Sequence, residues 1–218
     1  YQAGNLTSYN KTETDEFANQ KEIKWEGGKY DSRGNLIGYK ETTNDIYGNT
    51  QAKEWIGASY DTKTNLLNYT EKLTDEYSRV IITKWDAKDE KYDNFNNLLA
   101  YEKTEYFAND TTLNDEDILK EGNLTLKSKV KWEGEYYFRG PVNKNDELLK
   151  YKEEKTDENG KVEVTNWEVG KIDGNIPAYD SHGDMLEYTK VITSQGEPTL
   201  YEHWGKGMSD QEGYETKY

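Results

Sequence analysis

The chain has 218 residues, a formal net charge of -15, a pI of about 4.7 and no cysteine. An anionic chain is not attracted to phosphate backbones or acidic lipids, so nucleic acid and membrane surfaces are disfavoured as partners. The lack of cysteine excludes disulfides and thiolate metal sites, and no apolar run is long enough to span a membrane.

The composition combines two opposing signals. The hydrophobic and charged fractions are both 33%, which is typical of chains that cannot bury enough apolar surface to order themselves. The chain also carries 19 tyrosines and 6 tryptophans, each of which can bury a large ring and keep its polar tip hydrated. A thin, aromatic-rich β structure satisfies both observations.

A tyrosine and a tryptophan recur at a fixed spacing of 16 residues. Five pairs keep that spacing: Tyr9 and Trp25, Tyr39 and Trp55, Tyr69 and Trp85, Tyr151 and Trp167, Tyr188 and Trp204. A sixth pair, Tyr101 and Trp132, is 31 residues apart and so holds 15 extra residues. Self-similarity at a fixed period predicts a repeat architecture.

The repeats predict one continuous array over residues 1–218. The six units lie at about 1–29, 30–59, 60–91, 92–136 with the insertion, 137–174 and 175–218. The chain starts at Tyr1 rather than at methionine, and GYETKY at its end resembles the beginning of another unit. We therefore interpret the chain as part of a longer array.

Two classes of turn divide each unit. One resembles YDSRGN at 30–35 and YDTKTN at 60–65; the other resembles TDEFAN at 14–19 and TDENGK at 156–161. An early aspartate can accept hydrogen bonds from backbone amides, and a late glycine or asparagine accepts a positive φ, so both classes are predicted to close β-hairpins.

The runs between the turns have six to ten residues and are rich in Tyr, Trp, Thr, Ile and Val, as in LLNYTEKL and VEVTNWEV. The prediction is an all-β fold: an antiparallel β-meander of about six two-stranded repeats. Because a large open sheet twists, we expect the array to coil into a β-solenoid-like form or a curled ribbon. A six-bladed propeller is the rival, but its blades usually need about 40 residues or more.

These boxes carry a resemblance to known families. The YDSRGN and YDTKTNLLNY boxes resemble the Tyr-Asp repeats of the bacterial rearrangement-hotspot (Rhs) and teneurin-type proteins. The whole unit also looks like the Tyr-Asn/Asp repeats of very large bacterial exoproteins. The resemblance implies β-hairpin units wound into a spiral sheet, in bacterial proteins that are secreted or displayed at the cell surface.

The recurrent aromatics are the candidate site. We expect them to form a structural ladder that fastens neighbouring repeats, because repeat proteins bury a face between units. The alternative is that their rings stack against sugars. The ladder residues are Trp25, Trp55, Trp85, Trp132, Trp167, Trp204, Tyr39, Tyr69, Tyr101, Tyr151 and Tyr188.

Metal sites are weakly indicated. The turn aspartates could offer oxygens to Ca²⁺, but their role in the turns already explains them. The acidic cluster Asp115, Glu116 and Asp117 is a slightly better calcium candidate, and no other cofactor is indicated. His182 and His203 recur in no other unit and do not make a zinc site.

We therefore predict a non-catalytic structural segment of an extracellular fibre, stalk or surface protein, which associates with neighbouring repeats or identical chains. A carbohydrate-binding or adhesin module that uses exposed aromatics is the alternative, with glycans as the partner. No catalytic residue is predicted: nothing distinguishes any pair among the 43 acidic residues, and no GxSxG box or phosphate-binding glycine loop occurs.

Overall fold

The computed structural model describes residues 4–87, 91–137, 147–172, 176–180 and 183–205. Twelve strands form one sheet in the order β1-β2-β3-β4-β5-β6-β7-β8-β9-β10-β13-β14, and β11 pairs with β12 in a second sheet. The predicted all-β antiparallel meander is therefore confirmed, whereas the predicted coiling of the array stays a prediction.

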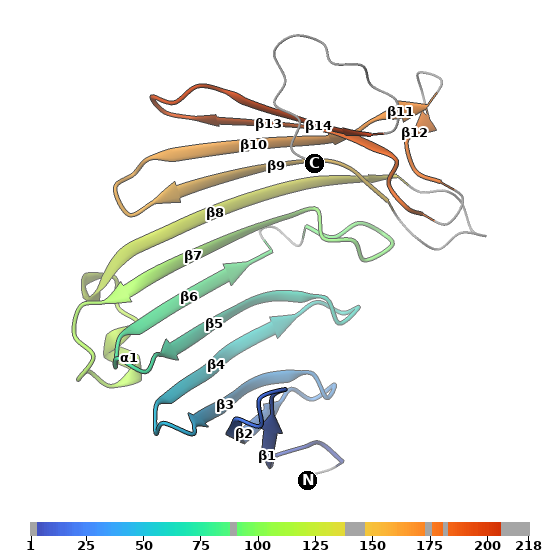
Figure 1. Cartoon of the computed structure of the whole chain (residues 1–218). Coiled ribbons are helices and arrows are strands. Elements are labelled where there is room, and N and C mark those ends of the chain that lie inside the picture. The colour runs from blue at the N-terminus through green and yellow to red at the C-terminus, as the bar shows by residue number, and fades with distance from the viewer. Residues whose placement is uncertain (1–3, 88–90, 138–146, 173–175, 181–182, 206–218) are drawn as a thin grey trace. The chain divides into compact units, whose positions relative to one another are not determined.

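The chain divides into two compact units. One unit comprises Tyr1–Glu90 and Lys103–Ser128, and the other comprises Lys91–Glu102 and Lys129–Tyr218. Figure 1 shows the strands by their labels. Strands in the first part of the chain are β1 (Ser8–Thr14), β2 (Gln20–Tyr30), β3 (Leu36–Asp45), β4 (Thr50–Tyr60), β5 (Leu66–Thr74), β6 (Val80–Asp86) and β7 (Ala100–Ala108).

The later strands follow a short helical segment, α1 (Asp115–Ile118) and a 3₁₀ turn at Glu121–Asn123. They are β8 (Leu124–Tyr137), β9 (Glu147–Asp157), β10 (Val162–Val169), β11 (Lys171–Ile172), β12 (Ile176–Pro177), β13 (Glu187–Ser194) and β14 (Leu200–Gly205). The hairpin β11–β12 was not predicted from the repeats. None of the helices in the described part of the chain has the length and apolarity that a membrane crossing requires.

The two predicted turn classes are one structure. In each of eight turns the N–H of an aspartate donates to the carbonyl of the fourth residue after it, at 2.9–3.0 Å. The third residue after the aspartate has a positive φ in every case. It is glycine in some turns, as at Gly34, and a residue with a side chain in others, as at Ala18 and Ser78. This is a three-residue hairpin loop closed by a residue in the left-handed region.

The aspartate side chain holds each turn closed. In the turn that begins at Asp31, one carboxylate oxygen accepts the N–H groups of Arg33 and Asn35, both at 2.9 Å. The Asn35 side chain donates to the other oxygen, also at 2.9 Å. Each turn therefore satisfies its own backbone groups locally, which explains why Asp and Asn recur at these positions.

The tyrosine that precedes some of these aspartates ties its YD turn to the residue that follows the YD turn of the previous repeat. The Tyr30 hydroxyl donates to the Leu6 carbonyl, and the Tyr60 hydroxyl donates to the Leu36 carbonyl, both at 2.7 Å. In the second unit Tyr179 donates to the Leu148 carbonyl at the same distance. The tyrosine of the YD box is thus a connection between repeats.

Replacing Tyr60 with phenylalanine is expected to lower the free energy of unfolding by about 0.5–1.5 kcal/mol, because the Leu36 carbonyl loses its hydrogen bond. Tyr47→Phe is the control, since Tyr47 is 79% exposed and lies at a turn. Equal stability of the two variants in urea unfolding would contradict the assigned role of the hydroxyl.

Deep burial is confined to small clusters. Among the described residues, only Ile82 and Ile118 are large side chains with an exposed fraction below 2%. Ile118 of α1 packs with Val80 and Ile82, so the acidic insertion, which the sequence analysis did not place in a core, covers one face of β6 in the first unit. In the second unit Trp167, Val169 and Ala178 form the buried cluster.

Candidate functional site: two aromatic ladders

The recurrent aromatics of the first unit stack in one row. Ring centroids of consecutive members lie 5.4–5.8 Å apart, and the row runs Tyr9, Trp25, Tyr39, Trp55, Tyr69, Trp85. The planes of Tyr9 and Trp25 differ by 14°, whereas those of Tyr39 and Trp55 differ by 51°. Centroid separations in this range are those of favourable aromatic pairs.

The second unit contains a row of the same kind. Its consecutive ring centroids are 5.5–6.2 Å apart, and it runs Tyr101, Trp132, Tyr151, Trp167, Tyr188, Trp204. The structure thus brings every predicted ladder residue into one of two rows, and Tyr9 joins the first. The sixth pair, Tyr101 and Trp132, stacks like the others at 5.7 Å despite its 31-residue spacing.

The 16-residue spacing produces the stacking through strand register. Within a hairpin, tyrosine and tryptophan are direct partners, as in Tyr39↔Trp55 and Tyr69↔Trp85. Between hairpins the register is offset: Trp55 opposes Glu71, and Tyr69 lies two residues before it on the same face. Direct and diagonal neighbours therefore alternate, and both are within reach of large rings.

Glycine makes room for two of the indole rings. A Cβ built on Gly134 would lie 2.7 Å from Cζ2 of Trp132 and closer still to Cη2. A Cβ built on Gly28 would lie 2.9 Å from Cζ3 of Trp25 and 2.6 Å from the Leu6 carbonyl oxygen. The indoles thus lie over backbone that has no side chain.

Burial differs along the rows. Trp25 is 7% exposed and Trp167 is 9% exposed, whereas Trp204 is 48% exposed and Tyr9 is 37% exposed. Burial raises the pKa of Tyr39, Tyr69 and Tyr151 above the usual value. The rows are therefore apolar in their interior and more hydrated at these two ends.

Tyr188 has a distinct environment. Its hydroxyl donates to a carboxylate oxygen of Glu202, and this hydrogen bond, helped by burial, raises its pKa to about 12. Lys190 approaches the other oxygen of Glu202 at 3.3 Å. The phenol is thus held neutral as a donor, which is a structural role rather than that of a base.

Lysine–carboxylate pairs lie on the same face as the first row. Glu105 accepts hydrogen bonds from Lys103 at 2.6 Å and Lys127 at 2.9 Å. Partial burial opposes ionisation of Glu105, but these two hydrogen bonds lower its pKa to about 2. Lowered carboxyl pKa values recur elsewhere, as at Glu13, Glu76 and Asp110, as expected for charged acceptors.

Two of the three weak calcium candidates form ion pairs with lysines. Asp115 pairs with Lys72 at 2.5 Å, and Asp117 pairs with Lys120 at 2.5 Å. No group of three or more His, Cys, Asp or Glu side chains that could hold a metal ion occurs in the parts of the chain that the structure describes. His203 lies 3.6 Å from Glu187, whereas His182 and the GYETKY end lie outside the described residues.

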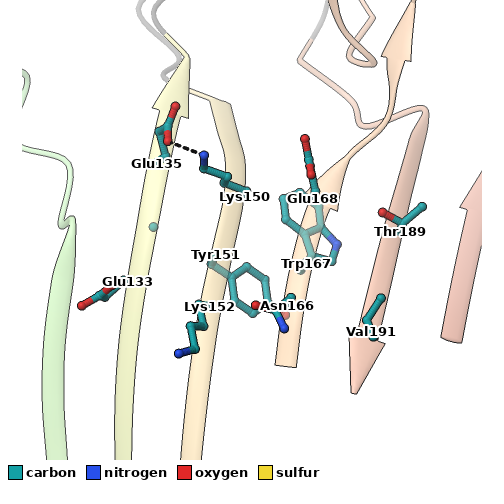
Figure 2. A pocket seen from close by; sticks show the side chains of 11 residues that line it. Glu133, Glu135, Lys150, Tyr151, Lys152, Asn166, Trp167, Glu168, Thr189 and Val191 are labelled. Atoms are coloured by element: carbon teal, nitrogen blue, oxygen red, sulfur yellow. Dashed lines mark ion pairs between the residues drawn. The ribbon is translucent and has the colours of Figure 1, made fainter. Parts of the chain in front are cut away.

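A shallow pocket of about 430 Å³ lies on the second unit. Lys152, Asn166 and Val191 are register partners and share the face opposite to the Tyr151 and Trp167 rings, since neighbouring residues of a strand alternate. Figure 2 shows Lys150 turned towards Glu135, with which it forms an ion pair at 2.8 Å. Most of the residues that line the pocket are polar or charged, and Tyr151 and Trp167 also contribute to it.

The turn aspartates predict an acid sensitivity of the first unit. Hydrogen bonds from asparagine side chains lower the pKa of Asp15, Asp31 and Asp45 below the ordinary 3.8. At Asp61 and Asp75, burial raises the pKa, but hydrogen bonds from Asn65 and Arg79 outweigh it. Because the folded pKa is depressed, this stabilisation is present above pH 3.8 and is lost as the pH falls through the lower folded values.

We therefore expect the melting temperature to stay level from neutral pH to about pH 4 and to fall below it. The triple variant Asp15→Asn, Asp31→Asn, Asp45→Asn should melt lower at neutral pH and show a shallower fall in acid. An identical acid profile in the variant would contradict the contribution of these carboxylates.

Sequence reasoning missed the Ile118 cluster, the room made by Gly134 and Gly28, and the identity of the two turn classes. The available signal was the glycine that is the fifth residue of both YDSRGN and TDENGK, because glycine readily adopts a positive φ. Comparison with known proteins adds no assignment: no protein-family model matches the chain, and a search of curated proteins gives no significant match.

Proposed function

We propose that the chain is a non-catalytic structural segment of a bacterial extracellular fibre, stalk or surface protein. The observation that carries this proposal is the mutual stacking within each aromatic row. A ring inside a row meets another ring on each side, as Trp167 meets Tyr151 at 5.5 Å and Tyr188 at 5.9 Å. Such rings hold strands together and have no face left for a ligand.

The other recurrent residues support the same role. The turn aspartates accept hydrogen bonds from their own turns, and the YD tyrosines Tyr30 and Tyr60 connect successive repeats. Arrays whose units contact mainly their neighbours can extend by repetition, which suits a stalk or fibre. The ladder rings, the turn aspartates and the YD tyrosines therefore each have a structural explanation, and the resemblance to Tyr-Asp repeats agrees with secretion or surface display.

Electron microscopy of the native material that contains this chain, with measurement of its mass per unit length, tests the proposal. We expect an elongated particle or filament with an axial repeat that corresponds to one or more of these hairpin units. Discrete compact particles with no such repeat would contradict the fibre or stalk role.

An alternative function, carbohydrate binding by exposed aromatics, is favoured by a separate observation. Several large aromatic side chains outside the rows are strongly exposed, among them Phe17 at 77%, Tyr47 at 79% and Tyr77 at 71%. Exposed rings are the surfaces on which sugars stack. Quenching or enhancement of tryptophan fluorescence by glycans would be expected only if rings of the rows also took part, as at the exposed Trp204.

A further inference from the structure

Three exposed aromatics occupy the same position in three hairpin turns. Phe17, Tyr47 and Tyr77 are each the third residue of a turn that begins at Asp15, Asp45 or Asp75. These turns close the hairpins β1–β2, β3–β4 and β5–β6, and so lie at one end of the strands of the first unit. We call these three residues the turn comb.

The hydrogen bonds of the turns fix the backbone of the comb. The N–H groups of Phe17, Tyr47 and Tyr77 donate to the leading aspartates at 2.9, 2.8 and 3.0 Å. The residue after each ring has a positive φ of 62–82°. All three rings therefore leave equivalent backbone positions.

The spacing of the comb follows from the sheet. Its turns are two strands apart, which corresponds to about 9.5–10 Å, because neighbouring strands lie about 4.7–4.9 Å apart. Gln51 of β4 donates to Glu76 of the next turn at 2.8 Å, so the second and third turns are also joined directly.

The turn itself does not require an aromatic at this position. The equivalent residues at the other end of the first unit are Arg33 and Lys63, and in the second unit Phe95 and Asn159 occupy the same place. Arg33 donates to the Tyr60 carbonyl at 3.1 Å, so its side chain has a role within the fold. The recurrence of exposed rings at one end of the first unit is therefore unexplained by folding.

The neighbouring charges restrict the ligand. Glu16 and Glu76 adjoin the comb, and the chain carries a net charge of -15, so a polyanion is disfavoured. The guanidinium of Arg79 lies 5.2 Å from the centroid of the Tyr77 ring and covers one of its faces. The turns that carry the rings are two strands apart, about 9.5–10 Å, which is a spacing for separate contacts along an extended ligand.

We propose that the turn comb binds an uncharged, extended β-1,4-linked pyranose polysaccharide. Such a chain is a two-fold ribbon, so it presents the same sugar face at every second residue, as the sheet presents a turn at every second strand. Each ring would cover one such apolar sugar face, and Glu16 and Glu76 would accept hydrogen bonds from hydroxyl groups. This site deepens the alternative function above and does not depend on the fibre role.

The test is isothermal titration of the folded chain with cellohexaose, with maltohexaose as the α-linked comparison. We expect cellohexaose to bind at millimolar or lower concentration, and maltohexaose to bind at least tenfold more weakly. The triple variant Phe17→Ser, Tyr47→Ser, Tyr77→Ser should lose at least tenfold in affinity, and Tyr47→Ser alone should lose several-fold. Because these side chains are exposed, circular dichroism should show an unchanged fold.

Phe95→Ser is the matched control, since Phe95 is also the third residue of such a turn and is 52% exposed. It should leave binding unchanged. The proposal is overturned if cellohexaose fails to bind, if maltohexaose binds equally well, or if the comb variants bind like the unchanged chain. Self-association that depends on the comb, without cellohexaose binding, would overturn it in favour of a second copy as the occupant.

Discussion

Replacing Trp167 with alanine is expected to lower the free energy of unfolding by about 3–5 kcal/mol. Trp167 is 9% exposed, and its ring plane lies 13° from that of Tyr151 at a centroid distance of 5.5 Å. It also packs in the cluster with Val169 and Ala178. Alanine at this position removes two ring contacts and leaves a cavity that strands held by hydrogen bonds cannot easily fill.

Trp204→Ala is the matched control for this prediction. Trp204 is 48% exposed and stacks on Tyr188 at 5.8 Å. Loss of one exposed aromatic pair should cost only about 1 kcal/mol. Urea unfolding followed by circular dichroism measures both variants, and an equal loss of stability would contradict the assignment of Trp167 as an interior member of a row.

Replacing Gly134 with alanine is expected to destabilise the second unit by about 1–3 kcal/mol, because the added methyl group overpacks the site. The new Cβ would lie 2.7 Å from Cζ2 of Trp132. The indole cannot move aside without disturbing its contacts with Tyr101 at 5.7 Å and Tyr151 at 6.2 Å. The energetic cost therefore reports on the rigidity of the row.

Gly122→Ala is the control for this overpacking. A Cβ built on Gly122 meets no atom within 4 Å, and Gly122 lies in the insertion rather than beneath a ring. We expect little change in its melting temperature. If Gly134→Ala melted at the same temperature as Gly122→Ala, the indole of Trp132 would not be held in place as described.

Much of the fold could be predicted from the spacing of two residue types. A tyrosine 16 residues before a tryptophan, with a turn between them, becomes the direct pair Tyr188↔Trp204 when the strands are antiparallel. The diagonal contact between hairpins was harder to predict from the sequence. It follows from the register between hairpins, in which Trp25 pairs with Glu41 and Trp55 with Glu71, so each tryptophan lies diagonally across from the tyrosine two residues earlier on the next strand.

The two turn classes differ in sequence but have the same backbone geometry. YDSRGN and TDEFAN share only their aspartate and their final asparagine, and Ala18, which stands in the place of Gly34, is not a residue that usually predicts a positive φ. The hydrogen bonds from the Asn19 and Phe17 backbone to Asp15 are nevertheless those of the YD turns. Counted from the aspartate, the first and fifth residues define the turn, and the residue at the fourth position varies between turns.

The insertion was harder to predict because its burial depends on distant residues. DEDI is acidic and reads as a solvated loop, yet Ile118 is 0% exposed against Val80 and Ile82. Asn114 caps α1 by accepting the N–H of Asp117 at 3.0 Å. A single apolar residue in a segment of four produces no hydrophobic periodicity, so only the tertiary structure shows what this residue contacts.

A double-mutant cycle between Tyr151 and Trp167 tests the stacked rows most directly. We predict a coupling of about 0.5–1.5 kcal/mol when both are replaced by leucine, beyond the sum of the single effects. Trp25 and Tyr69, which belong to one row but stack neither on each other nor on a common ring, should be additive within about 0.5 kcal/mol. Additivity of Tyr151 and Trp167 would contradict the claim that ring-on-ring contacts fasten the strands.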